Sequence, residues 1–149
     1  MEIERKFLPK ECPLNLDKYQ CVLIEQAYLN TDPVVRVRKQ DDEYILTYKG
    51  KGMLAREEYN LPLNEKSYLH LLNKADGNVI TKRRYKIPLE NNLVAELDIF
   101  ENSFKGLVIL EVEFSSIEDA NAFEAPEWFG EDVTNNPIYA NSYLSRMKK

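Results

Sequence analysis

The chain of 149 residues has little cysteine and histidine. Its two cysteines, Cys12 and Cys21, lack the spacing of a zinc cluster; a disulfide between them is possible, but a domain of this size does not need one. His70 is the only histidine and lies in a leucine-bearing helical stretch, so we expect a surface or packing residue. These shortages argue against a zinc centre and against a catalytic triad.

Other absences concern membranes, nucleic acids and nucleotide motifs. No apolar run approaches the roughly 20 residues of a membrane span, and the N-terminus does not resemble a signal peptide, so we expect a cytoplasmic protein. The net charge of -5 argues against general binding to nucleic acids or anionic membranes. Gly50-Lys51-Gly52 lacks the spacing of a phosphate-binding P-loop and is predicted to be a hairpin turn.

The composition predicts one domain built mostly from strands. Hydrophobic residues make up 44% of the chain, which suffices for one core, so residues 1–149 are predicted to form a single domain. Asn64, Ser116 and Pro137 mark the starts of three predicted helices, which we expect to pack outside the strands. Eight extended segments lie between turn-forming stretches: 2–8, 21–29, 34–40, 44–49, 55–61, 79–87, 93–100 and 107–114.

Charged residues recur at every second position in these strands. Glu2, Glu4 and Lys6 therefore share one face of the first strand. The opposite faces are apolar or mixed, as at Val35 and Val37. The same spacing joins Arg36 with Arg38, Thr47 with Lys49, Arg56 with Glu58, Lys82 with Arg84 and Lys86, Glu96 with Asp98, and Glu111 with Glu113.

Two closed barrels fit this alternation. An ordinary barrel points its apolar faces inward, whereas a charged tunnel points its charged faces inward and covers its apolar outer faces with helices. The basic and acidic stripes are segregated by strand, and a solvating surface would mix the two signs. We therefore predict a mainly β (α+β) fold, an eight-stranded antiparallel closed β-barrel with a charged interior and a few outer packing helices.

The charged interior predicts what the barrel binds. Two like charges about 4 Å apart repel by roughly 4 kcal/mol near a protein surface, so each cluster favours an oppositely charged ligand. The basic residues predicted to hold a chain of phosphates are Lys6, Arg36, Arg38, Lys49, Arg56, Lys82 and Arg84. The acidic residues predicted to bind Mg2+ or Mn2+ are Glu2, Glu4, Asp98, Glu111 and Glu113. Together they predict phosphoryl chemistry.

In their order along the chain, these positions resemble the signature of the CYTH domain, the triphosphate tunnel metalloenzymes. The resemblance covers nearly the whole chain, and the segment 128–134 with Tyr139 and Asn141 resembles the C-terminal stretch of the family. Asn60 stands where the family commonly has a further acid, which leaves the metal count open. The motifs that carry the resemblance are Glu2-x-Glu4-x-Lys6, Arg36-x-Arg38, Lys49, Arg56 with Glu58, Lys82-x-Arg84, Asp98 and Glu111-x-Glu113.

The resemblance implies a tunnel that binds a small-molecule triphosphate and one or two divalent metal ions. Its compact bacterial pattern favours hydrolysis of the terminal phosphate of inorganic tripolyphosphate. A thiamine triphosphatase, a class IV adenylate cyclase and a non-catalytic module that binds polyphosphate or a nucleotide are the alternatives, and a monomer and a homodimer are both open. Tyr28 resembles a tyrosine proposed to act with the motif lysine, here Lys6, in some bacterial members; packing within a strand is the competing interpretation.

Overall fold

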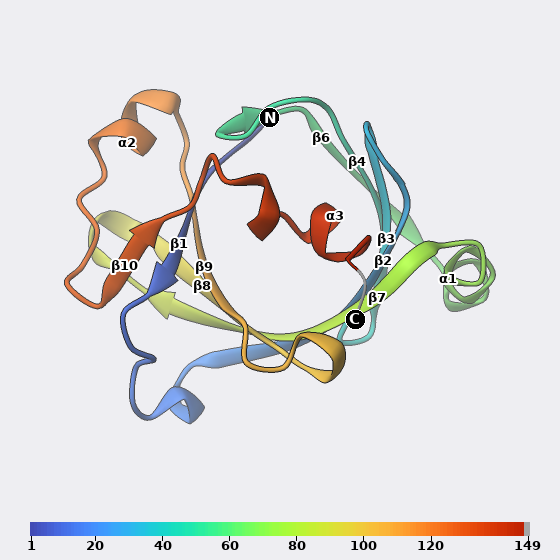
Figure 1. The fold of residues 1–149 in the computed structure, drawn as a ribbon, viewed down its shortest axis with the longest axis horizontal. Coiled ribbons are helices and arrows are strands. Elements are labelled where there is room, and N and C mark those ends of the chain that lie inside the picture. Colours follow the sequence, from blue (N-terminus) through green and yellow to red (C-terminus); the bar gives the residue numbers. More distant parts are fainter. Residues whose placement is uncertain (148–149) are drawn as a thin grey trace.

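The computed structural model describes residues 1–147 and consists mainly of one antiparallel sheet rolled into a ring (Figure 1). The strand order is β10-β1-β9-β8-β7-β2-β3-β4-β6, and β5 pairs with β1. Only Glu57 separates β5 from β6, so the pairing of Glu2 with Arg56 nearly closes the barrel. The strands are β1 (Glu2–Pro9), β2 (Gln20–Thr31), β3 (Val34–Gln40), β4 (Glu43–Lys49), β5 (Ala55–Arg56), β6 (Glu58–Leu63), β7 (Asp76–Pro88), β8 (Val94–Phe100), β9 (Val108–Glu113) and β10 (Phe129–Asp132).

The predicted strands are confirmed, with two differences. The segment predicted as one strand over 55–61 is divided into β5 and β6, which pair with β1 and β4 respectively. The tenth strand, β10, was not predicted, because its four residues contain no clear alternation. It pairs with β1 beside the ring, so the barrel itself corresponds to the eight predicted strands.

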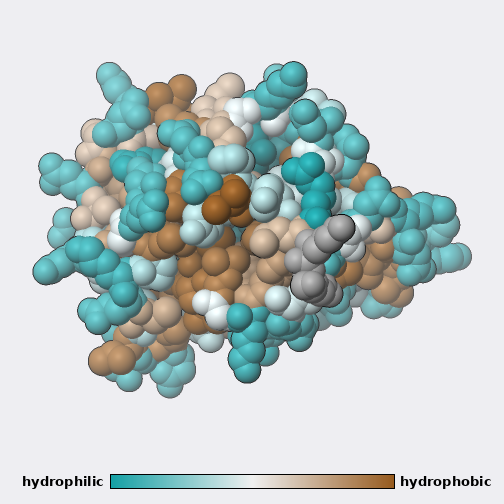
Figure 2. All heavy atoms as spheres, in the orientation of Figure 1, coloured by the Kyte–Doolittle hydropathy of each residue, from teal (hydrophilic) through white to brown (hydrophobic). Residues whose placement is uncertain are grey.

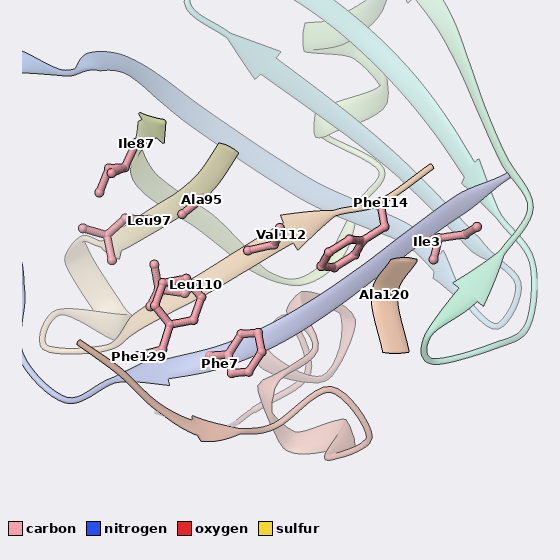
Figure 3. Packing of buried hydrophobic residues seen from close by; sticks show 10 residues of the cluster. All are labelled: Ile3, Phe7, Ile87, Ala95, Leu97, Leu110, Val112, Phe114, Ala120 and Phe129. Atoms are coloured by element: carbon pink, nitrogen blue, oxygen red, sulfur yellow. The ribbon is translucent and has the colours of Figure 1, made fainter. Parts of the chain in front are cut away.

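The larger hydrophobic core lies outside the ring, on the outer faces of β1, β7, β8 and β9 (Figure 3). Leu97, Leu110 and Val112 are completely buried there. Phe7 and Phe129 pack edge to face, with ring centroids 5.0 Å apart, where β10 covers β1. The apolar strand faces are therefore covered from outside, as the charged-tunnel arrangement requires.

Two helices pack outside the ring and begin at the predicted caps. The Asn64 side chain accepts a hydrogen bond from the Ser67 backbone at the start of α1 (Glu65–Leu72), and Ser116 accepts one from Asp119 at the start of α2 (Ile117–Ala122). No helix within residues 1–147 is long and apolar enough to cross a membrane. The short 3-10 helices are η1 (Leu16–Lys18), η2 (Glu90–Asn92), η3 (Asn102–Phe104) and η4 (Pro137–Tyr139).

The third predicted helix differs from the expectation in two ways. Pro137 begins the 3-10 helix η4, and the α-helix that follows, α3 (Asn141–Leu144), lies inside the ring (Figure 1). Leu144 packs against inward-facing residues that include Tyr28, Ile80 and Phe100. Atoms fill the ring in the space-filling view of the same face, with hydrophobic residues near its middle (Figure 2). The interior is therefore apolar at this end, and α3 acts as a plug. An outward location was predicted because the short segment contains no pattern that distinguishes the two sides of a barrel.

The outer core should carry much of the stability of the barrel. We expect Leu110→Ala to lower the free energy of unfolding by about 2–5 kcal/mol, since it leaves a cavity in a packed layer. Leu23→Ala, at a side chain that is 42% exposed, should change it by about 0.5 kcal/mol or less. Urea unfolding measures both, and equal losses would contradict an outward core.

Candidate functional site

Side chains at alternate positions of each strand point into the ring, and the strand register determines which of them face each other. Glu4 lies opposite Glu113 and Lys6 opposite Glu111 between β1 and β9. Glu111 in turn lies opposite Glu96 on β8. Three adjacent strands therefore place four carboxylates on one wall of the interior.

These side chains line a cavity of about 270 Å³ that is closed on one side by residues 140–142. The structure brings twelve of the thirteen predicted site residues to its wall: Glu2, Glu4, Lys6, Tyr28, Arg36, Arg38, Lys49, Arg56, Lys82, Arg84, Glu111 and Glu113. Asp98 is the exception. The other lining residues, which were not predicted as site residues, are Val34, Gln40, Ile45, Glu58, Asn60, Glu96, Ala140, Asn141 and Ser142.

Asp98 lies beneath the cavity wall, where two cations occupy its carboxylate. Arg84 donates from Nε to Oδ1 at 2.8 Å and from Nη2 to Oδ2 at 2.9 Å, and Lys82 Nζ lies 2.7 Å from Oδ2. Burial opposes ionisation of Asp98, but the charges of Arg84 and Lys82 outweigh it and keep the pKa of this carboxyl below its usual value. Asp98 therefore orients Arg84 and Lys82 in this structure, and its role as a metal ligand stays a prediction.

Glu2 forms a second neutralised group at the other end of the cavity. Its two carboxylate oxygens lie 2.9 Å from Lys49 Nζ and 3.3 Å from Arg56 Nε. Glu58 Oε2 lies 3.4 Å from the same Lys49 nitrogen. These charges hold the pKa of Glu2 below its usual value despite burial, which acts in the opposite direction. Glu2 thus orients two of the predicted phosphate-binding cations.

Arg36 and Arg38 differ from these cations, because within residues 1–147 neither forms an ion pair with a carboxylate. Arg36 Nη2 donates to Thr47 Oγ1 at 3.3 Å, and its buried Nε has no partner in the described chain. Arg38 Nε donates to the amide oxygen of Gln26 at 2.8 Å. Burial, followed by the charges of Arg36 and Arg84, lowers the pKa of Arg38 to about 9. Two adjacent guanidinium groups are thus left with positive charge that no carboxylate balances.

Glu4 is the acidic counterpart of these arginines. No hydrogen bond or ion pair engages its side chain among the described residues, although it lines the cavity. Burial raises the pKa of Glu4 to about 8, and the charges of Glu111 and Glu2 add to the effect. Burial and nearby carboxylates also raise the pKa of Glu113, which lies opposite Glu4. This pair favours either a proton or a bound cation.

Lys6 and Tyr28 both line the cavity, but no hydrogen bond connects their side chains in residues 1–147. Lys6 Nζ donates to the Tyr139 carbonyl at 3.3 Å and lies 3.8 Å from Glu111 Oε1. Tyr28 is 4% exposed and packs in the apolar cluster around α3. Lys6 therefore lies on the acidic wall, while Tyr28 combines a packing role with a place at the cavity surface.

The sequence pattern identifies some of the site residues that were not predicted and leaves others unmarked. Glu58 and Glu96 stand in the charged stripes, so the alternation of charge could have identified them. Gln26 is inward-facing and completely buried, and its inward neighbours on β2 are Ile24 and Tyr28, neither of which is charged. No local pattern marks Gln26 as part of a polar site.

Comparison with known proteins agrees with this geometry. The CYTH domain family matches residues 1–147. The chain belongs to the CYTH family. It is 37% identical over 147 residues to an inorganic triphosphatase of Nitrosomonas europaea, covering 97% of this chain and 96% of that protein. It is 38% identical over 153 residues to an inorganic triphosphatase of Acetivibrio thermocellus, covering 96% and 92%.

Solved structures agree as well. The crystal structure of the inorganic triphosphatase NE1496 matches this CYTH domain with a TM-score of 0.73 and 34% identity, covering 99% of this chain and 96% of that one. The PH1819 protein of Pyrococcus horikoshii matches with a TM-score of 0.55 and 18% identity, covering 82% and 83%. The second likeness shows a shared fold.

CYTH triphosphatases depend in general on a metal ion, and the acidic wall fits one by its chemistry. Glu4, Glu111 and Glu113 offer carboxylate oxygens, the hard ligands that Mg2+ and Mn2+ prefer. Within residues 1–147, however, no three acidic, histidine or cysteine side chains are arranged as a complete metal site. Mg2+ commonly keeps waters and takes substrate phosphates as ligands, so an incomplete protein set is compatible with it.

The pKa of Glu4 predicts how the metal-free protein responds to pH. The pKa of Glu4 is about 8 in the folded protein, against an ordinary value of 4.5. Between these pH values the folded protein keeps a proton on Glu4, and ionising Glu4 destabilises the fold. Stability due to this group should therefore fall as pH rises from 4.5 to 8. In EDTA at pH 8.5, we expect Glu4→Gln to unfold at a higher Tm than the unaltered protein, by about 4 °C for each kcal/mol of stability gained. At pH 4.5 the two proteins should unfold at a similar Tm.

Differential scanning calorimetry at the two pH values measures the effect. Glu118→Gln, at an exposed carboxyl on α2, is the control and should change Tm equally little at both pH values. A Glu4→Gln variant that gains nothing at pH 8.5 would show that Glu4 is already neutralised within the protein.

Proposed function

We propose that this CYTH domain hydrolyses inorganic tripolyphosphate and releases its terminal phosphate in a reaction that depends on Mg2+ or Mn2+. The observation that carries the proposal is that, among the described residues lining one cavity, two arginines have no carboxylate partner and two carboxylates, Glu4 and Glu113, have no cationic partner. A polyanion bound together with a divalent cation would compensate both sets of charge at once. The names of the two curated relatives support the same activity.

The lining of the cavity favours an inorganic substrate over an organic triphosphate. Tyr28 contributes the only aromatic ring among the described lining residues, and Val34, Ile45 and Ala140 are the other apolar ones. Pockets for organic ligands usually have about 300–1,000 Å³ and a mainly apolar lining. A cavity of about 270 Å³ with charged walls offers little apolar surface for a nucleobase or a thiazole ring.

In this proposal the guanidinium groups of Arg36 and Arg38 bind phosphate oxygens through bidentate hydrogen bonds. Lys82 and Arg84 are held by Asp98, and their positive charges flank the same anion. Lys49 and Arg56, held by Glu2, bind from the other end of the cavity. Cations from several strands thereby contact the substrate, and these contacts fix its orientation.

The acidic wall would hold the metal in this scheme. Glu4, Glu111 and Glu113 are the residues proposed to bind one or two divalent ions. A bound Mg2+ or Mn2+ supplies neutralisation of phosphate charge and lowers the pKa of bound water. Lys6 lies beside Glu111 and is proposed to stabilise charge on the phosphate that is transferred. Tyr28 is proposed to assist Lys6 in orienting that phosphate.

The activity itself is the first prediction. The purified protein should release phosphate and pyrophosphate from tripolyphosphate with Mg2+ or Mn2+, and EDTA should abolish turnover. Thiamine triphosphate and ATP should react more slowly, since their organic groups find little apolar surface. Product analysis by ion chromatography separates the alternatives: cyclic AMP formed from ATP would overturn the hydrolase assignment, and tight binding without turnover would indicate a binding module.

The two arginines without carboxylates provide a sharper prediction. Arg36→Ala and Arg38→Ala should each reduce kcat/KM for tripolyphosphate by about 10- to 100-fold, the effect of losing a charge-assisted hydrogen bond. Arg83→Ala is a matched control on β7, because Arg83 is exposed on the outer face and pairs with Glu101 at 2.8 Å. Initial rates of phosphate release measure all three, and a loss at Arg83 equal to that at Arg36 would contradict the assigned cavity.

A further inference from the structure

Two neutral amides connect the plug helix α3 with two cations of the cavity. Asn141 Oδ1 accepts a hydrogen bond from Lys82 Nζ at 3.1 Å and another from Gln26 Nε2 at 3.0 Å. Gln26 Oε1 accepts a hydrogen bond from Arg38 Nε at 2.8 Å. The chain of bonds therefore runs from β7 through α3 to β2 and ends on β3.

The hydrogen-bonded series ends on Lys82 and Arg38, and these two cations determine how both amides are oriented. Lysine and arginine can only donate hydrogen bonds, so an amide oxygen must face each of them. The Asn141 oxygen faces Lys82 and also accepts a hydrogen bond from the NH2 group of Gln26. The oxygen of Gln26 is then free to accept the hydrogen bond from Arg38. Asn141 Oδ1 thus accepts two hydrogen bonds and Gln26 Oε1 accepts one, and every donor in the series meets an oxygen atom.

This arrangement leaves the ligand-binding edges of both cations available. Arg38 uses only Nε for a protein hydrogen bond within residues 1–147, so its two terminal nitrogens remain available at the cavity. Lys82 uses two of its three donors, for Asp98 and Asn141. An amide oxygen orients a cation without removing its charge, whereas a carboxylate, as at Arg84, also neutralises it.

We propose that Gln26 and Asn141 are positioning residues that hold Arg38 and Lys82 in the geometry that binds a phosphate chain and preserve the charge of Arg38. This inference rests on the proposed triphosphate site and assigns to α3 a part in forming it. Neither amide reacts; each acts through the cation that it holds.

The end of α3 has a separate attachment, so the role of Asn141 can be tested without releasing the helix. Asn78 at the start of β7 donates from its side chain to the carbonyls of Leu144 at 3.1 Å and Met147 at 2.7 Å, and its backbone donates to Ser145 at 2.6 Å. Gly77 has a φ of 76°, and a side chain there would collide with the Ser145 carbonyl. These contacts hold α3 independently of Asn141.

The experiment measures binding of tripolyphosphate in EDTA by isothermal titration calorimetry, which does not require turnover. Gln26→Leu and Asn141→Leu retain side-chain size and remove the hydrogen bonds. Each should raise Kd by about tenfold or more, the scale of a disturbed charge-assisted contact. In an Arg38→Ala background, Gln26→Leu should raise Kd by less than about twofold, because its target is already absent. Gln20→Leu on β2 and Asn121→Leu on α2, both exposed, are the matched controls and should bind like the unaltered protein.

The outcomes separate this inference from the proposed function. Binding by both Leu variants as tight as that of the unaltered protein would overturn the inference, while phosphate release by the unaltered protein would leave the proposed function standing. An equal loss for Gln26→Leu with and without Arg38 would show a purely structural role and also overturn it. If the unaltered protein binds tripolyphosphate without hydrolysing it, the proposed activity fails and the same Kd ratios still decide the inference. No binding by the unaltered protein in EDTA would overturn the inference, while phosphate release with Mg2+ or Mn2+ would still leave the proposed function standing.

Discussion

Each cation inside the ring is either neutralised by a carboxylate or held only by neutral oxygen atoms, and the rest of the molecule depends on this division. Arg84 and Lys82 share the buried Asp98, whereas Arg36 and Arg38 are held by a hydroxyl and an amide. Unpaired charge away from water is unfavourable unless a ligand compensates it. The division therefore separates cations whose charge the protein already compensates from cations whose charge only a bound anion can compensate.

A charged interior cannot supply the hydrophobic stabilisation of the fold, and the barrel obtains it from the core packed on the outer faces of its strands. The layer around Leu97 and Leu110 is covered by β10 and α2, and a smaller apolar cluster lies within the ring around α3. Burial of apolar area is the dominant favourable contribution to folding. The outer core thus permits charged walls within, and α3 closes the cavity that they form.

Much of the fold and of the cavity lining could be predicted because both follow from alternation along single strands. The spacing of Glu2, Glu4 and Lys6 places all three on one face, and the segregation of basic and acidic stripes indicates that this face points inward. The location of α3 and the role of Gln26 could not be predicted in this way. A four-residue helix has no periodicity that identifies its neighbours. Gln26 has no charged neighbour on the inward face of β2 that would indicate a polar network.

The sequence by itself determined which side chains share the inner face, since a strand alternates its sides whatever it pairs with. Only the tertiary structure decided which of those charges are compensated. Asp98 and Arg38 carry equally clear charges in the sequence, yet Asp98 is bound by two cations and Arg38 by none of the carboxylates in residues 1–147. The physical reason is that compensation depends on strand register and on the return of α3 into the ring, which bring together residues as far apart as Gln26 and Asn141.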